Sequence, residues 1–125
     1  MTDMSTDNSD VWVEEIRLTG AGRSLDVTFG DGEKHQLAAE YLRVESPSAE
    51  VQGHSADQKI CVAGKSGVAI IKIDPIGNYA VRLTFDDMHS TGIYSWDNLL
   101  RLGRDREAIW SAYLARLESE GKTRS

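Results

Sequence analysis

The sequence predicts an α+β domain in which two β-hairpin units form a twisted, mostly antiparallel sheet, with short helices and a C-terminal amphipathic helix packed on it. Two patterns carry this prediction. Apolar and polar residues alternate over 25–29 and again over 79–85, which is the period of a half-buried strand. Apolar residues then recur at helical spacing over 109–117, opposite a charged face.

The chain is predicted to fold as one domain. Its 125 residues, 40% of them hydrophobic, suffice for one core but not for two. We place the domain at residues 11–120. The polar stretch 1–10 is expected to be a disordered tail, because it cannot bury enough apolar surface to offset the entropy of ordering, and residues 121–125 are expected to fray.

The first hairpin unit is predicted from its turns and its alternation. VWVEEIRLT at 11–19 forms the first strand, and the glycines of GAGR at 20–23 permit the turn that follows. Leu25, Val27 and Phe29 face the core from the second strand, which ends at the turn sequence GDGE.

A short helix and a long loop are predicted next. AAEYLRV at 38–44 is rich in helix formers, but Pro47 disfavours helical geometry at the residue before it, so only one or two turns fit. The polar stretch 46–58 has no sustained periodicity and is predicted to be a loop. Loops of this length in compact domains are often functional.

The second half is predicted to follow the same plan. VAIIKID at 68–74 is a strand, and PIGN joins it to a strand whose inward residues are Tyr79, Val81, Leu83 and Phe85. Ser95 is the expected N-cap of a two-turn helix, and Gly103 is expected just after its end.

The C-terminal helix is predicted to run from Asp105 to about Glu120. Its apolar stripe consists of Ile109, Trp110, Tyr113, Leu114 and Leu117. From the strand alternations and this stripe, we expect a core that contains Phe29, Val81, Leu83, Phe85, Ile109 and Leu117.

The two halves share an apparent internal repeat. At an offset of 56, matching residues are Val27 and Leu83, Thr28 and Thr84, Phe29 and Phe85, Asp31 and Asp87, and Leu37 and Ile93. Upstream, Ile16 and Gly20 match Ile73 and Gly77 at an offset of 57. Because hairpins use few patterns, two unrelated hairpins remain the alternative explanation.

Composition excludes several classes of function. With 14 basic and 20 acidic residues the formal charge is -6, which opposes binding to nucleic acid. The opening MTDMSTDNSD has neither a basic n-region nor an apolar run, so we expect no signal peptide and no membrane segment. Cys61 is the only cysteine, which excludes an intramolecular disulfide. We expect a cytoplasmic protein.

The stretch DDMHSTGIYSW at 86–96 concentrates the polar chemistry. A structural role for His89 is favoured over a partner or metal contact, with catalysis least favoured, because no two histidines have a metal-ligand spacing. Asp86 and Asp87 fit a turn better than an acid/base pair. GKS at 64–66 lacks the earlier glycine of a phosphate loop.

Three blocks of sequence carry a family resemblance: YLRVESPSAEVQGH at 41–54, IGNYAVRLTFDDMHSTGIYSW at 76–96 and LLRLG at 99–103. They resemble a small bacterial family of unknown function that is named for its similarity to the N-terminal domain of gamma-butyrobetaine hydroxylase. The resemblance extends over about residues 12 to 119.

The resemblance also implies where a metal site would lie. In the hydroxylase, this domain carries a structural zinc on three cysteines spaced C-x-C-x-x-C and one later histidine, and the catalytic iron and 2-oxoglutarate occupy a separate barrel domain that this chain lacks. The cysteine positions fall on Ser46, Ser48 and Val51, and the histidine position falls on His89. Hydroxyls are poor zinc ligands and valine is none, so we expect no metal and no other cofactor. His89 is expected to be hydrogen-bonded to the 46–51 segment instead.

These features imply a non-catalytic accessory or protein-binding module. Similar domains occur fused to Mrp-type P-loop ATPases that handle iron–sulfur clusters, so the resemblance implies such an ATPase as partner and a role in cluster assembly or delivery. The expected partner surface consists of Ser46, Ser48, Glu50, His54, Asp87, His89, Tyr94 and Trp96.

Two other functions remain open. One is a zinc- or iron-binding protein, or an oxidoreductase component, in which His89 acts with Asp86, Asp87, His54 or Cys61. The other is a small-ligand carrier, which would need a preformed pocket.

Overall fold

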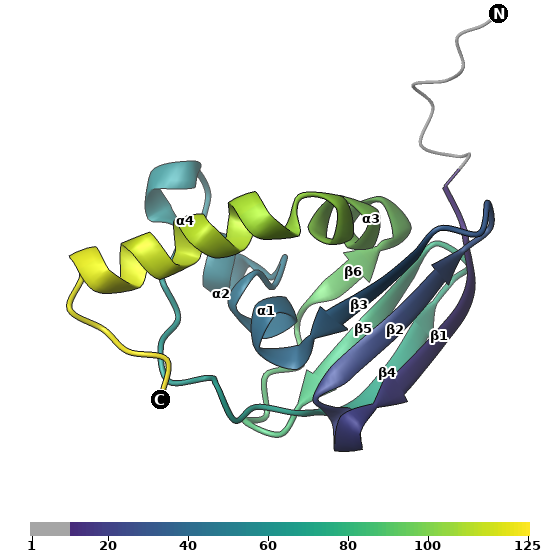
Figure 1. Ribbon diagram of the computed structural model, residues 1–125, viewed down its shortest axis with the longest axis horizontal. Helices are drawn as coiled ribbons and strands as arrows, with labels where there is room; N and C mark the ends of the chain where they lie inside the picture. Colours follow the sequence, from purple (N-terminus) through teal and green to yellow (C-terminus); the bar gives the residue numbers. More distant parts are fainter. Residues whose placement is uncertain (1–10) are drawn as a thin grey trace, which may run out of the picture.

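The computed structural model describes residues 11–125, so the tail expected at 1–10 lies outside the described residues. These residues form two three-stranded antiparallel sheets and four α-helices, which confirms the α+β class (Figure 1). The first sheet has the order β1 (Val13–Thr19), β2 (Ser24–Phe29), β3 (Lys34–Ala38), with the 3-10 turn η3 (Gly20–Gly22) between β1 and β2. The second has the order β4 (Ile70–Ile76), β5 (Ala80–Phe85), β6 (Ile93–Ser95).

The two sheets share one main core. The inward residues of the central strands are at most 3% exposed, namely Leu25, Val27, Phe29, Val81, Leu83 and Phe85. Tyr79, expected to head the alternation in β5, instead lies in the preceding turn and is 58% exposed. The turn comes later than predicted because β4 continues through Pro75, and an edge strand tolerates proline.

A short helix follows each sheet. α1 (Ala39–Val44) follows β3, and α3 (Trp96–Arg104) follows β6. The hydroxyl of Ser95 accepts a hydrogen bond of 3.1 Å from a backbone N–H in the first turn of α3, so it is the N-cap as predicted. Gly103 lies inside α3 and not after it. Close packing requires glycine there, since a Cβ would come within 2.5 Å of the ring of His35.

The stretch 46–58, predicted to be a loop, contains two short helical elements. They are α2 (Ala49–Gln52) and the 3-10 turn η4 (Ala56–Gln58). A helix of four residues is too short for apolar periodicity to reveal. Val51 is 2% exposed and holds α2 to the interior.

The C-terminal helix α4 (Arg106–Ser119) begins over the main core and then extends past it (Figure 1). Ile109 and Trp110 pack against the main core but are only partly buried, so Ile109 is less buried than expected. The helix then builds a second, smaller cluster, formed by Val44, Cys61, Tyr113 and Leu117. Leu114, expected in the apolar stripe, is 38% exposed. No helix in the described part of the chain is long and apolar enough to cross a membrane.

Residues 121–125, which we expected to fray, are held against the domain. Their backbone accepts hydrogen bonds of 2.9 Å from the backbone N–H groups of Gly64 and Ser66. The guanidinium of Arg124 donates two hydrogen bonds, of 2.9 and 2.7 Å, to the buried carboxylate of Glu40. These contacts join segments far apart in the chain, so local composition does not reveal them.

The two sheets are structural repeats. Each first strand has a register irregularity, between Val13 and Glu15 in β1 and between Ile70 and Lys72 in β4, at an offset of 57 residues (70 minus 13). The helices α1 and α3 also begin 57 residues apart. Shared irregularities are stronger evidence of repetition than shared turn residues, because a generic hairpin has no reason to place a bulge at the same position.

The strand register corrects one of the matches between the halves. Leu37 opposes Leu25 in the first sheet, and Tyr94 opposes Val81 in the second. Leu37 therefore corresponds to Tyr94 and not to Ile93. The difference arises because the turn before β6 is one residue longer than its counterpart before β3.

The turns after β2 and β5 have the same geometry. In each, an aspartate (Asp31 or Asp87) accepts a hydrogen bond from the backbone N–H two residues later, at 2.9 and 3.1 Å. The residue between them, Gly32 or Met88, has a left-handed backbone with φ of 93° or 73°. Glycine adopts this conformation freely, whereas a methionine is strained in it.

We expect Met88→Gly to stabilise the protein. Glycine relieves the left-handed strain, and little packing is lost because Met88 is 76% exposed. The free energy of unfolding in urea should rise by about 1 kcal/mol. As the converse control, Gly32→Ala should lower it, since a Cβ there meets no atom within 4 Å and only the backbone is affected. A Met88→Gly protein less stable than the wild type would contradict the assignment of strain to this turn.

Candidate functional site

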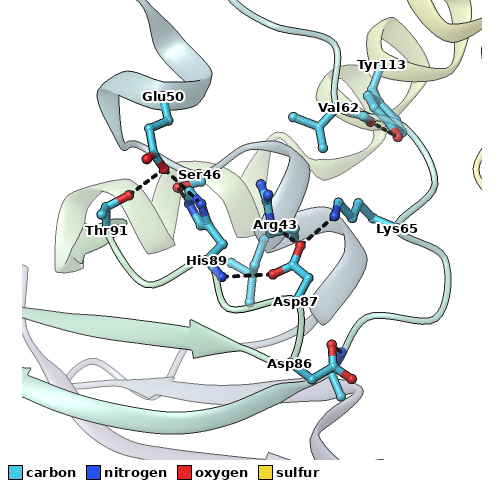
Figure 2. A network of polar contacts seen from close by, with 12 residues as sticks. Arg43, Ser46, Glu50, Val62, Lys65, Asp86, Asp87, His89, Thr91 and Tyr113 are labelled. Carbon is cyan, nitrogen blue, oxygen red and sulfur yellow. Dashed lines mark hydrogen bonds and ion pairs between the residues drawn. The ribbon is translucent and has the colours of Figure 1, made fainter.

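The segment after α1 and the turn after β5 meet at a buried hydrogen bond (Figure 2). Ser46 Oγ lies 2.9 Å from His89 Nε2, and the two residues are 0% and 8% exposed. The hydrogen bond expected between His89 and the 46–51 segment is therefore present. It connects the first half of the chain to the second.

The other ring nitrogen of His89 faces Glu50. Nδ1 is 3.2 Å from Oε1 of Glu50, and the Thr91 hydroxyl donates to the same oxygen at 3.0 Å. Burial and the nearby charge of Arg43 lower the pKa of His89, so the imidazole is neutral near neutral pH. A neutral ring carries one proton. Placing it on Nδ1 lets the ring donate to Glu50 while Nε2 accepts from the Ser46 hydroxyl.

Asp87 anchors the turn that carries His89. Its Oδ2 accepts hydrogen bonds from Arg43 Nε at 2.8 Å and from Lys65 Nζ at 2.6 Å, and its Oδ1 accepts from the backbone of His89 at 3.1 Å. Burial opposes the charged form, but the hydrogen bonds from Lys65, His89 and Arg43 outweigh it and lower the pKa of Asp87 to about 2. Asp87 therefore stays charged and ties the turn to α1 and to the 61–66 segment.

The four positions that correspond to zinc ligands in the hydroxylase domain lie together but do not fit zinc. The backbone N–H of Ser48 donates to Ser46 Oγ at 3.3 Å, and that of Val51 donates to the Ser48 carbonyl at 3.0 Å. With His89, the set comprises one imidazole, two hydroxyls and an aliphatic side chain, which is no zinc donor set. Within residues 11–125, no three His, Cys, Asp or Glu side chains are placed to share a metal ion.

Of the residues considered for another metal site with His89, only Asp87 reaches it. Asp86 accepts a hydrogen bond of 3.1 Å from the backbone just before β4 and points away from Asp87 (Figure 2). Cys61 is buried in the small cluster under α4. His54 is exposed, and its backbone donates to a side chain four residues later.

The expected partner surface is only partly accessible. The Glu50 side chain is 67% exposed, His54 is exposed, and Asp87 is half-buried. The buried members of the set are Ser46, Ser48 and His89. The accessible part is thus smaller than predicted, and the buried part holds it in place.

Two further members of the expected surface lie elsewhere. Tyr94 is 0% exposed, because the register of β6 turns it inward, and its hydroxyl donates to the carbonyl of Leu42 at 2.5 Å. Trp96 lies at the opposite end of β5 from His89, where its indole N–H donates to the carbonyl of Asn78 at 2.8 Å. Neither belongs to the surface around Glu50.

Four residues of the site were missed from the sequence: Arg43, Lys65, Met88 and Thr91. Lys65 lies in the GKS motif, which was tested only as a phosphate loop. The match between Asp31-Gly32 and Asp87-Met88 was the available signal for Met88, since it places methionine where the first half has glycine. Arg43 and Thr91 have no local signal.

Ser46, His89 and Glu50 follow the hydrogen-bonding order of a Ser–His–acid catalytic triad. The nucleophile of such a triad must reach its substrate, but Ser46 is 0% exposed. Gly92 lies so close that a Cβ there would be 2.5 Å from Ser46 Oγ. The hydroxyl also accepts the hydrogen bond from Ser48 described above. We therefore assign the three side chains to a structural hydrogen-bond chain.

A family model described as gamma-butyrobetaine hydroxylase-like, N-terminal, matches residues 16–100. No curated protein matches the chain. Two proteins with NMR solution structures are similar to it. One is 40% identical with a TM-score of 0.79, over 92% of this chain and 90% of the other. The second is 42% identical with a TM-score of 0.80, over 99% of this chain and 90% of the other.

A crystal structure from Acidithiobacillus ferrooxidans is also similar, and its protein is described as having unknown function and belonging to the DUF971 family. It is 38% identical with a TM-score of 0.61, over 74% of this chain and 92% of the other. The family model covers well over half of the 125 residues. The chain therefore belongs to the gamma-butyrobetaine hydroxylase-like N-terminal family.

Proposed function

We propose that this domain is a cytoplasmic, non-catalytic accessory module that binds a protein partner through segment 46–54 and turn 86–92. The observation that carries the proposal is a buried network that holds exposed groups in fixed positions. Glu50, with a side chain 67% exposed, is held by His89, and Met88, 76% exposed, is held in a left-handed conformation. Strained, exposed positions of this kind cluster at functional sites.

Iron–sulfur cluster assembly or delivery is the process we propose, with an Mrp-type P-loop ATPase as the partner. The support is the occurrence of similar domains fused to such ATPases. The chemistry of this chain agrees with an accessory role, because protein-bound clusters are held by several cysteine thiolates and Cys61 is the only cysteine here, buried under α4. Cluster binding would belong to the partner.

The double variant Glu50→Ala/His54→Ala should weaken binding to the purified Mrp-type ATPase of the same organism. Both side chains are exposed, so their loss changes the surface and leaves the melting temperature nearly unchanged. We expect the Kd, measured by biolayer interferometry, to rise by at least about fivefold. The matched control is Lys72→Ala/Asp74→Ala, an exposed pair on β4 that should bind like the wild type. Equal affinity for all three proteins would exclude this surface.

The purified domain is expected to contain neither zinc nor iron in stoichiometric amounts. The donor set around His89 does not fit zinc, so elemental analysis should find far less than one metal ion per chain, and EDTA should leave the melting temperature unchanged. The alternative, a zinc- or iron-binding protein, would show about one metal per chain and would lose stability in EDTA.

The variant His89→Ala separates these two outcomes by a second measurement. Without a metal, it leaves the buried hydroxyl of Ser46 without its partner, which should lower the free energy of unfolding by about 1–3 kcal/mol. The loss should be the same with and without EDTA. If the loss appears only in protein that carries metal, the metal-binding function replaces the one proposed here.

Stability should fall between about pH 7 and pH 5 because of His89. The folded chain holds the pKa of His89 below its ordinary value of 6.5, so over this range the unfolded chain binds the proton more readily. The stabilisation is fully present above that ordinary value and is lost as the pH falls toward the folded pKa. His89→Gln should therefore flatten the pH dependence of the free energy of unfolding.

The matched control for this measurement is His54→Gln, which replaces an exposed histidine and should keep the wild-type pH dependence. The carboxyls of Asp87 and Glu33 do not interfere, because both have a pKa of about 2 and titrate at lower pH. Identical pH dependence in wild type and His89→Gln would show that another group is responsible.

A further inference from the structure

A cavity of about 370 Å³ lies between α1, the 59–61 segment and one face of α4. Its volume falls within the range of small-molecule sites, roughly 300–1,000 Å³. The floor is apolar, since Val44 is 1%, Cys61 5% and Tyr113 6% exposed. The hydroxyl of Tyr113 donates to the carbonyl of Val62 at 2.6 Å, so its hydrogen-bonding capacity is already used. The floor therefore offers apolar contact and no free donor.

The charged residues that line the cavity have a positive excess. Lys59 Nζ is 2.6 Å from Glu45 Oε1, so this pair is neutral as a unit. Arg116 pairs with Glu120 at 2.7 Å. Arg101 is exposed, and no carboxylate in the described part of the chain pairs with it. An unpaired guanidinium beside an apolar cavity is unusual on a chain with a net charge of -6.

We propose that this cavity binds a small organic anion, a monocarboxylate with an apolar chain. The carboxylate pairs with Arg101, because a guanidinium and a carboxylate form two parallel charge-assisted hydrogen bonds. The chain of the ligand covers Val44, Cys61 and Tyr113, which gains the free energy of burying apolar surface. The positive lining disfavours a cationic ligand, and the apolar floor gives an inorganic anion nothing to bind. This site uses different residues from the partner surface, so either proposal can fail without the other.

The test is an NMR titration of the ¹⁵N-labelled domain with octanoate at neutral pH. We expect saturable shifts of the backbone amides around residues 44–45, 59–61 and 109–116. The uncharged analogue 1-octanol has the same apolar chain and should bind at least about tenfold more weakly, which is the usual effect of losing a hydrogen bond to a charged group. Equal binding of the two, or octanoate shifts confined to other residues, would overturn the proposal.

Two variants and a control sharpen this test. Arg101→Gln should weaken octanoate by about tenfold and leave 1-octanol unchanged, whereas Arg82→Gln, an exposed arginine on β5, should leave both unchanged. Ala112→Trp places a large side chain at an exposed position of the cavity wall and should abolish binding of both ligands. If Arg101→Gln and Arg82→Gln behave alike, or if Ala112→Trp still binds octanoate, the cavity is not the site.

Discussion

The structure depends on the mutual burial of two apolar sheet faces. A three-stranded sheet with one apolar face is stable only when that face is covered, and here each sheet covers the other. Two buried tyrosines connect the halves further. The hydroxyl of Tyr94 donates to the carbonyl of Leu42, and that of Tyr41 to the carbonyl of Leu102, so each half satisfies a helix carbonyl of the other. Burial raises the pKa of both hydroxyls, which keeps them neutral donors.

The candidate site follows from this arrangement and from one extra residue in the second repeat. The longer turn before β6 brings Gly92 against Ser46 and lets Thr91 reach Glu50. In a zinc domain, the metal would join this turn to the 46–51 segment. Here a chain of hydrogen bonds makes the same connection. Because the imidazole within it is neutral, the connection requires no buried counter-charge.

Local patterns predicted the elements that depend on local patterns. Alternation located the central strands and their core residues, and the N-cap at Ser95 was visible as a serine before a helical stretch. The features that were missed are set by distant contacts. Gly103 is inside α3 because of His35 on β3, and residues 121–125 are ordered by the 64–66 segment and Glu40.

For the site, the alignment to a zinc-binding pattern predicted that His89 would meet the 46–51 segment, which no spacing rule within this chain could have shown. It could not reveal the partners that complete the network. Asp87 was expected to cap a turn and does so, but its ion pairs with Arg43 and Lys65 need three segments to converge. Tyr94 was misassigned because a three-residue strand gives too little alternation to decide which face is buried.

The short helix α2 shows why the segment around it can serve as a recognition surface. Four residues cannot form a stable helix alone, so its position is set by its neighbours. On one side, Gln52 donates to the carbonyl of Ser46 at 2.8 Å and Glu50 meets the ring of His89. On the other, the backbone of Ile60 donates to the carbonyl of Val51 at 2.7 Å, and both Gln52 and Ile60 line the cavity under α4. The exposed carboxylate of Glu50 is therefore placed by interactions from both halves of the chain, and any displacement of the His89 turn or of the cavity wall must move it.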